Sequence, residues 1–157
     1  MPRLSRLAVA SSAVEPEALA DLLEQPSAAR LASLSVWDTM AGEDFWEALA
    51  QSENVRSLRR LNADDSDLTD ELALALSRSR HLAIEELDMF YTPLGVAAAC
   101  ALLSAQPRLS LRCDVRSAAL HQRLRLRAFG KRFTPGRRHD CGTPTWIFGQ
   151  HFRMDRY

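Results

Sequence analysis

The side chains best suited to chemistry gather in the last third of the sequence. His139, Cys141 and His151 are potential zinc ligands, with Cys113 as a fourth. Structural zinc sites usually bring in their ligands as pairs about three to five residues apart, and these residues lack that spacing. A catalytic role for the run 139–141 (His-Asp-Cys) would need an oriented base and an oxyanion site, and the sequence indicates neither. Phosphate-binding glycine motifs are also absent. We therefore expect no catalytic residue, no metal and no cofactor.

A basic segment, residues 123–138, is the next candidate. Arginines alternate there with Phe129 and Phe133, and such a pattern can contact phosphates and stack on bases. Residues 1–108 hold 9 basic and 17 acidic side chains, whereas residues 109–157 hold 11 and 3, so that the net charge is zero. Only Lys131 among the 20 basic residues is a lysine, which indicates a GC-rich genome. We therefore expect a solvated basic face beside an acidic body, and no nucleic-acid partner.

Composition places the chain among ordinary globular proteins. It has 157 residues, 46% of them hydrophobic and 25% charged, which fits one domain. No apolar run approaches the roughly 20 residues that span a bilayer, so we expect no membrane partner and a cytoplasmic location. Cys100, Cys113 and Cys141 are odd in number, which argues against a disulfide framework. We expect Cys100 and Cys113 to be small buried hydrophobes.

An internal repeat organises the elements that must position any site. Leu4–Val9, Leu31–Val36, Leu58–Ala63 and Ile84–Met89 align at offsets of 27, 27 and 26 residues. Further columns agree in all four units: a hydroxyl residue (Ser12, Thr39, Ser66, Thr92), an apolar residue two positions later (Val14, Ala41, Leu68, Leu94) and apolar residues at helical spacing (Ala18/Leu19/Leu22, Phe45/Trp46/Leu49, Leu72/Ala73/Leu76, Ala98/Ala99/Leu102). Agreement over four units is a strong repeat signal.

Each unit changes from a strand period to a helix period. In the first part alternate residues such as Leu7 and Val9 share one side of a strand, and in the second part pairs such as Phe45 and Leu49 share one helix face. Repetition predicts parallel strands joined by right-handed crossovers. One unit of about 27 residues cannot bury both apolar faces alone, so neighbouring units must stack.

The pattern resembles the leucine-rich-repeat family, in particular short bacterial-type arrays of its ribonuclease-inhibitor-like class. The resemblance covers about residues 4–115. It implies an α/β right-handed solenoid, a short horseshoe with about five parallel strands on the concave face and helices on the convex face. In that family Asn or Cys after the strand ties the turn together; here Ser12, Thr39, Ser66 and Thr92 stand at that position, followed by Glu15, Gly42, Thr69 and Gly95 at another turn position.

The end of the repeat is less regular. A fifth strand is expected in Leu109–Val115, with Leu109, Leu111, Cys113 and Val115 on one face. Ser117 is expected to cap a last helix, 118–129, with Ala119, Leu120, Leu124 and Phe129 inward and Gly130 as its stop. Residues 134–145 indicate a loop, and Trp146–Phe148 with Phe152 a closing strand. The expected solenoid is 1–130, with units near 4–30, 31–57, 58–83, 84–108 and 109–130, and 131–157 is a C-terminal cap or tail.

Residues that alternate away from the core should form three rows on the concave face. The rows are Arg6/Ser33/Arg60/Glu86, Ala8/Ser35/Asn62/Asp88 and Ala10/Trp37/Asp64/Phe90. Asp38, Asp65 and Tyr91 lie beside them. Exposed aromatic residues are common interface anchors, although Trp37 and Phe90 would also fit a packing role over a neighbouring turn. The expected partner-binding residues are Trp37, Asp64, Asp88, Phe90, Arg60, Asn62 and Glu86.

The resemblance favours a non-catalytic protein-interaction module whose partner is a protein, basic or amphipathic to suit this face. The alternative is a structural end-unit of a longer array, or self-association that joins the acidic body to a neighbour's basic tail. The absence of an amphipathic cap before Leu4 favours that alternative, because it would leave a strand edge open.

Overall fold

A computed structural model of the chain describes residues 5–10, 14–115 and 120–135. The fold is α/β. The strands are β1 Arg6–Ala10, β2 Ser33–Trp37, β3 Arg60–Asn62, β4 Glu86–Leu94, β5 Ser110–Val115 and β6 Phe133–Pro135. The helices are α1 Pro16–Glu24, α2 Glu43–Gln51, α3 Asp70–Arg78, α4 Val96–Ala105 and α5 Leu120–Arg127, with short 3₁₀ turns η1 Pro26–Arg30, η2 Glu53–Val55 and η3 Gly130–Arg132.

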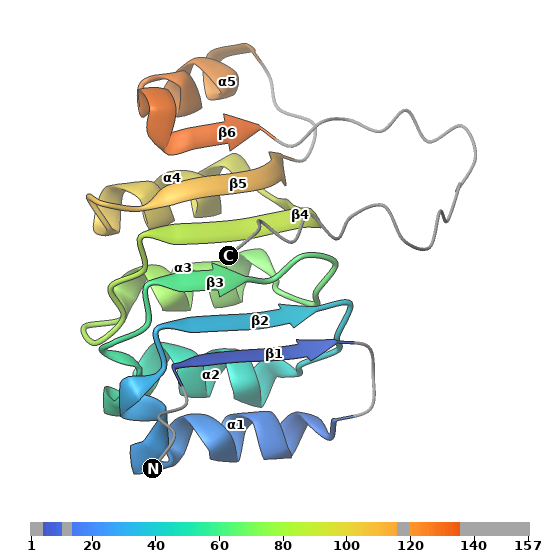
Figure 1. The fold of residues 1–157 in the computed structure, drawn as a ribbon. Helices are drawn as coiled ribbons and strands as arrows, with labels where there is room; N and C mark the ends of the chain where they lie inside the picture. The colour runs from blue at the N-terminus through green and yellow to red at the C-terminus, as the bar shows by residue number, and fades with distance from the viewer. Residues whose placement is uncertain (1–4, 11–13, 116–119, 136–157) are drawn as a thin grey trace, which may run out of the picture.

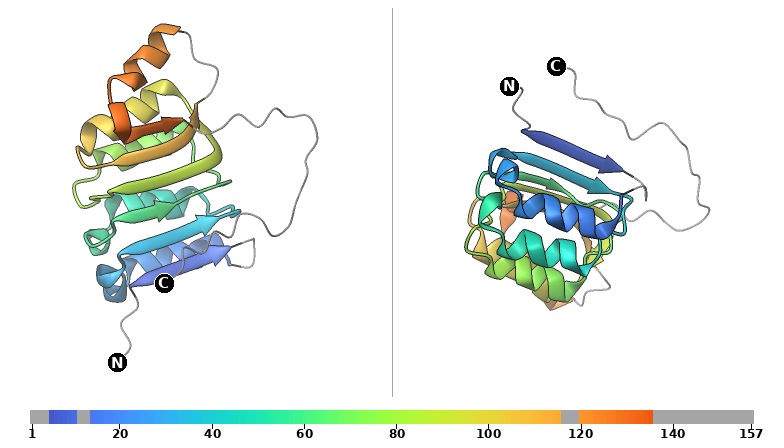
Figure 2. Two further views of the ribbon diagram at one scale, coloured as in Figure 1. Left: turned by 45° about the horizontal axis from the view of Figure 1, so that its top comes forward. Right: turned by 90° about the horizontal axis from the view of Figure 1, so that it is seen from below.

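The six strands form one parallel sheet in the order of the sequence, β1 to β6 (Figure 1). The helices lie along one side of this sheet and leave the other side without a helix among the described residues (Figure 2). One continuous row joins Leu7, Leu34, Leu61, Leu87 and Leu111, which confirms the register that the repeat predicted. The alignment of leucines at nearly constant spacing is therefore what sets the pairing of the strands.

The core lies between the sheet and the helices. Leu34, Leu61 and Leu87 from the strands are at most 2% exposed, and Trp46 of α2 is fully buried. The Phe45 and Trp46 rings pack edge to face, with centroids 4.8 Å apart. Such a pair adds to the stabilisation from burial alone. The first unit is less complete, because Leu22 is only partly buried and Ala18 is exposed on the side without a preceding helix.

The predicted hydroxyl residues bond to the backbone of the turns. Thr39 Oγ1 donates to the Val36 carbonyl at 3.0 Å, and Ser66 Oγ donates to the Ala63 carbonyl at 2.8 Å. Thr92 Oγ1 also donates to the Ala63 carbonyl, at 3.1 Å, one unit away. The prediction that these hydroxyls tie the turns together is confirmed for Thr39 and Ser66, whereas Thr92 bonds to the turn of the preceding unit. Ser12 lies outside the described residues.

The residue before each of these hydroxyls has a left-handed backbone. The φ angles are 52° at Asp38, 50° at Asp65 and 62° at Tyr91. Aspartate tolerates this conformation better than most residues, whereas an aromatic residue rarely adopts it. The same unusual conformation at the same place in three consecutive units shows that the units repeat in backbone as well as in sequence.

Replacing Thr92 by valine should lower the free energy of unfolding by about 1 to 3 kcal/mol. Valine has nearly the same shape, but it can neither donate to the Ala63 carbonyl nor accept from the Ser66 backbone N–H, which lies 2.9 Å from Thr92 Oγ1. Urea unfolding followed by circular dichroism measures the change, with Thr134→Val at an exposed position as the control. An equal effect of both substitutions would show that the hydrogen bonds do not matter.

Aspartates from one unit hold the start of a helix in another. Asp67 accepts from the backbone N–H of Gly42, the N-cap of α2, and from Trp46 Nε1, each at 2.8 Å. Asp70 accepts from the backbone N–H of Gly95, the N-cap of α4, at 2.8 Å. A Cβ atom on Gly95 would overlap with Asp70 Oδ2, so a larger residue at this position would displace the carboxylate.

The last part of the described chain corrects two predictions. Leu124, expected to face inward, is 52% exposed, and Leu126 is buried instead. Thr134 and Pro135, assigned to a loop, belong to β6, which pairs with β5 and makes six strands instead of about five. Gly130 has a positive φ of 59° just after α5 and η3 begins there, as expected for a helix stop.

Several expectations for this region fall on residues outside the described part. These are the Ser117 cap, the inward Ala119 and the closing strand at Trp146–Phe148 with Phe152.

Within the described part, one arginine holds the end of the sheet together. The Arg132 guanidinium donates to the carbonyls of Leu103, Gln106 and Leu109, and so connects η3 to the segment between α4 and β5.

Candidate interaction surface on the open face of the sheet

We call the side of the sheet opposite the helices the open face. Strand pairing brings the expected rows together. The first row runs Arg6, Ser33, Arg60, Glu86 and continues to Ser110; the second runs Ala8, Ser35, Asn62, Asp88 and continues to Arg112; in the third, Ala10 pairs with Trp37. All seven predicted binding residues therefore lie on or next to one surface, held by a rigid backbone.

The third row continues beyond the end of β3 through hydrogen bonds. The Asp64 carbonyl accepts from the Asp38 N–H at 3.0 Å, and Asp64 Oδ1 accepts from the Phe90 N–H at 2.7 Å. Trp37 is 39% exposed and Tyr91 51% exposed, while Phe90 is partly buried. Neither Trp37 nor Phe90 belongs to the buried core cluster. The end of β2, the residues after β3 and the middle of β4 thus bring aromatic side chains near carboxylates, and we call this region the aromatic edge. It consists of Trp37, Asp38, Asp64, Asp65, Phe90 and Tyr91.

Two ion pairs cross the strands of the open face. Arg60 Nε lies 3.2 Å from Glu86 Oε2, and both side chains are about half exposed. Arg112 contacts both oxygens of Asp88, with Nε 2.5 Å from Oδ1 and Nη2 2.9 Å from Oδ2. The sequence prediction missed Arg112, although the alternation of β5 already placed it on this side. The second pair fixes Asp88, so Asp88 offers less to a partner than its charge suggests.

Burial changes the acidity of two aspartates on this surface. Partial burial raises the pKa of Asp64 above its ordinary value, while its hydrogen bond from the Phe90 N–H acts in the opposite direction. Burial also raises the pKa of Asp88, and the charge of Arg112 opposes that increase. Both carboxylates would be stabilised by a cation that covers the surface, because a new positive charge compensates the loss of solvation.

The pKa of Asp64 implies a pH-dependent stability that Asp64→Asn should remove. A raised folded-state pKa means that the folded chain keeps a proton on Asp64 at pH values where the unfolded chain, with its ordinary pKa of 3.8, has lost it. This contribution to stability is present below pH 3.8 and is lost as pH rises through the raised pKa. An asparagine side chain at this position stays neutral and can still accept from Phe90, so the variant should gain stability over the wild type across that window.

Urea unfolding at a series of pH values measures this difference. Asp65→Asn, at the exposed neighbouring position, is the matched control. A difference between wild type and Asp64→Asn that stays constant with pH, or that shrinks as pH rises, would contradict the interpretation.

Burial keeps the thiols of the two described cysteines protonated near neutral pH. Cys100 and Cys113 are free and buried, as predicted. Burial raises the pKa of the Cys113 thiol to about 12, so the nucleophilic thiolate is scarcely formed near neutral pH. No cluster of His, Cys, Asp or Glu in the described ranges could hold a metal ion. His139, Cys141 and His151 lie outside them.

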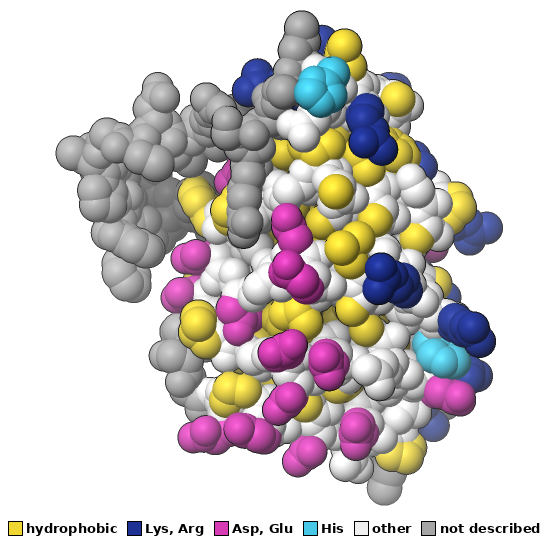
Figure 3. Space-filling model, turned by 180° about the vertical axis from the view of Figure 1, so that it is seen from behind, with side chains coloured by type: hydrophobic (Ala, Val, Ile, Leu, Met, Phe, Trp, Pro, Cys, Tyr) yellow, Lys and Arg dark blue, Asp and Glu magenta, His cyan; other side chains and the backbone are white. Residues whose placement is uncertain are grey.

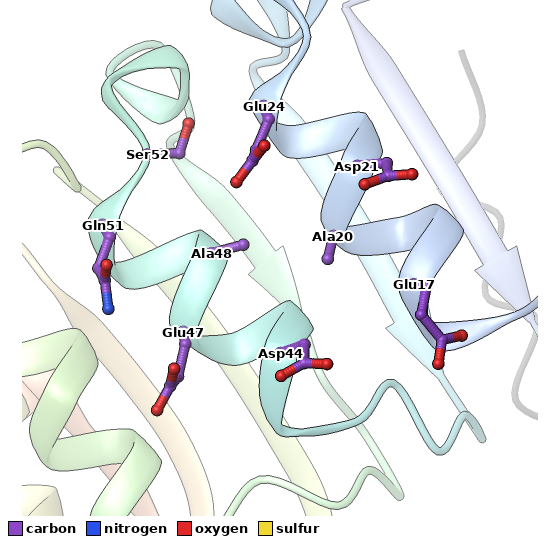
Figure 4. Close-up of a pocket in the computed structure, with 9 residues that line it drawn as sticks. All are labelled: Glu17, Ala20, Asp21, Glu24, Asp44, Glu47, Ala48, Gln51 and Ser52. Atoms are coloured by element: carbon purple, nitrogen blue, oxygen red, sulfur yellow. The ribbon is translucent and has the colours of Figure 1, made fainter.

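A second feature, on the helical side, was not predicted. A groove of about 450 Å³ runs between α1 and α2 (Figure 4), lined by Glu17, Ala20, Asp21, Glu24, Asp44, Glu47, Ala48, Gln51 and Ser52. The sequence carries a signal for it, because α1 has acidic residues at positions i, i+4 and i+7 (Glu17, Asp21 and Glu24). Figure 3 shows acidic side chains spread over this part of the helical side, whereas basic side chains lie mainly along one margin of the view and near its other end.

No known protein-family model matches the chain, and no curated protein matches it. Among the described residues, none of the helices has the length and apolar character that crossing a bilayer requires.

Proposed function

We propose that the repeated units form a leucine-rich-repeat solenoid of the ribonuclease-inhibitor-like class, and that the chain is a non-catalytic protein-interaction module that binds on the open face. The in-register leucine row, the sequential strand order and the repeated hydroxyl turns support the solenoid. The strand face, which no helix covers among the residues that the structure describes, supports the mode of binding. Parallel strands usually have both faces covered, so a face without a helix is available to a partner.

The exposed Trp37 at the aromatic edge is the observation that carries this proposal. A large aromatic side chain that is 39% exposed on a rigid strand gains free energy when a partner covers it. Tyr91 and the partly buried Phe90 extend the apolar area, and Asp38, Asp64 and Asp65 surround it with negative charge. A basic or amphipathic segment of a protein partner suits this chemistry, because its cations can contact both carboxylates and ring faces.

The test is affinity capture from the native lysate, carried out in parallel with the wild type and with Trp37→Ala/Phe90→Ala. A partner that the wild type retains and the double variant loses supports binding at the aromatic edge, and chemical cross-links between that partner and β2–β4 would locate it there. A partner that both proteins retain equally would move the binding site elsewhere.

A further inference from the structure

The two ends of the described sheet both expose apolar residues, and they carry opposite charges. At the first end, no strand pairs with the outer side of β1 among the described residues. Leu7 and Val9 of β1 are only partly buried, whereas the equivalent Leu34 and Val36 of β2 are 1% and 0% exposed. An apolar crevice opens there, lined by Leu7, Leu22, Ser27, Ala28 and Leu31. This end has the surface of a unit that lacks a neighbour.

The other end presents matching apolar residues. β6 pairs with β5 on one side only within the part of the chain described. Phe129 and Phe133 pack against the core but remain partly exposed, and Leu124 of α5 is 52% exposed. A bare strand edge beside apolar residues is a template for pairing with another chain.

Opposite charges distinguish the two ends. The exposed side chains of α1 include Glu17, Asp21 and Glu24, and the helix has no basic residue. Those of α5 include Arg123, Arg125 and Arg127, and the helix has no acidic residue. The first helix and the last helix of the described array therefore carry three unit charges each, of opposite sign.

We propose that copies of this chain stack end to end, with β6 of one copy beside β1 of the next and α5 of the first beside α1 of the second. All strands are parallel and all helices lie on one side, so a copy added in the same orientation continues both layers (Figures 1 and 2). Stacking would bury Leu7, Val9 and Leu22 and place arginines next to carboxylates. Because the two surfaces are different, the contact does not close on itself and produces chains of increasing length.

The opposite charges of α1 and α5 favour a second copy of this chain as the molecule that covers the two ends of the sheet. Glu17, Asp21 and Glu24 of α1 line one groove with Asp44 and Glu47 of α2, so this end of the molecule carries a concentrated negative charge that attracts the arginines of a neighbouring α5. Such stacking leaves the open face accessible, so it does not depend on the function proposed above.

Sedimentation velocity of the full-length chain over about a hundredfold range of concentration tests the proposal. The wild type should form a ladder of species whose average mass rises with concentration and falls as ionic strength rises. Arg123→Glu/Arg127→Glu and, separately, Glu17→Arg/Asp21→Arg should each weaken association by at least about tenfold. A mixture of the two variants should associate again, since each end then meets an opposite charge.

Arg78→Glu/Arg80→Glu on and after α3 is the matched control, because it makes the same change of net charge at exposed positions away from both ends. Thermal unfolding should be similar for all variants. A wild type that stays monomeric at every concentration overturns the proposal. A discrete dimer, or association that the end variants do not change, would overturn it as well.

Discussion

Replacing Trp46 by alanine should lower the free energy of unfolding by about 3 to 5 kcal/mol, the largest loss of stability expected from one substitution in this chain. Trp46 is fully buried between α2 and the sheet and packs edge to face on Phe45. Its removal leaves a cavity at the centre of the core. It also removes the indole N–H that Asp67 Oδ1 accepts at 2.8 Å, so a carboxylate that holds the start of α2 loses a partner.

Urea unfolding followed by circular dichroism gives the size of this effect. Trp37→Ala is the matched control, because it deletes the same side chain from an exposed position and should change the free energy of unfolding by less than about 1 kcal/mol. Trp46→Phe separates the two causes: it fills most of the cavity but cannot donate to Asp67, and should cost about 1 to 3 kcal/mol. Similar losses for Trp37→Ala and Trp46→Ala would contradict the assignment of core and surface.

The double variant Trp37→Ala/Phe90→Ala should lower affinity for a partner bound at the aromatic edge by about a thousandfold. Two anchors that each contribute about 2 kcal/mol account for a change of this size. Both side chains lie outside the buried core cluster, so the variant should still unfold cooperatively.

Titration calorimetry with the captured partner measures the affinity. The control is Leu124→Ala, which removes an exposed apolar side chain at the far end of the sheet and should leave the affinity unchanged. If the double variant fails to fold cooperatively, Trp37 and Phe90 act as core residues and the aromatic edge is not a binding surface.

The strand part of the fold could be predicted because every unit repeats the same spacing. The leucine columns determine which residues pair, and alternation then determines which residues reach the open face. The spacing thus correctly predicts the rows through Arg60, Asn62 and Glu86. The hydroxyl column predicted the turns for the same reason, since Thr39, Ser66 and Thr92 bond within the unit or to its neighbour.

Prediction was wrong where the period changes. Residues after Val115 keep no constant offset from the earlier units, so the inward face of the last helix was assigned through Leu124 instead of Leu126. β6 has only three residues and ends at Pro135. Because a short apolar stretch beside glycine and proline has the composition of a loop, the sequence indicated a loop at this place. Only pairing with β5 reveals it as a strand.

The aligned positions of the repeat could not predict the contacts between units. Asp67 and Asp70 each hold a helix start in a different unit, yet they stand at different positions of the same unit and no equivalent residue repeats them. Arg132 reaches carbonyls more than 20 residues away, and nothing in its own neighbourhood indicates this. At the candidate site, the sequence did not predict the ion pair between Arg112 and Asp88, because the three predicted rows of the open face end at the fourth strand and leave out β5.

The order of the strands also affects how the chain can acquire its structure. Each strand pairs with the strand that precedes it along the sequence, from β1 to β6. A chain that emerges from the ribosome can therefore add each new unit to one already formed, without waiting for a distant segment. Such vectorial growth keeps the loops that must close to the length of a single repeat, which favours rapid folding for a wholly parallel sheet.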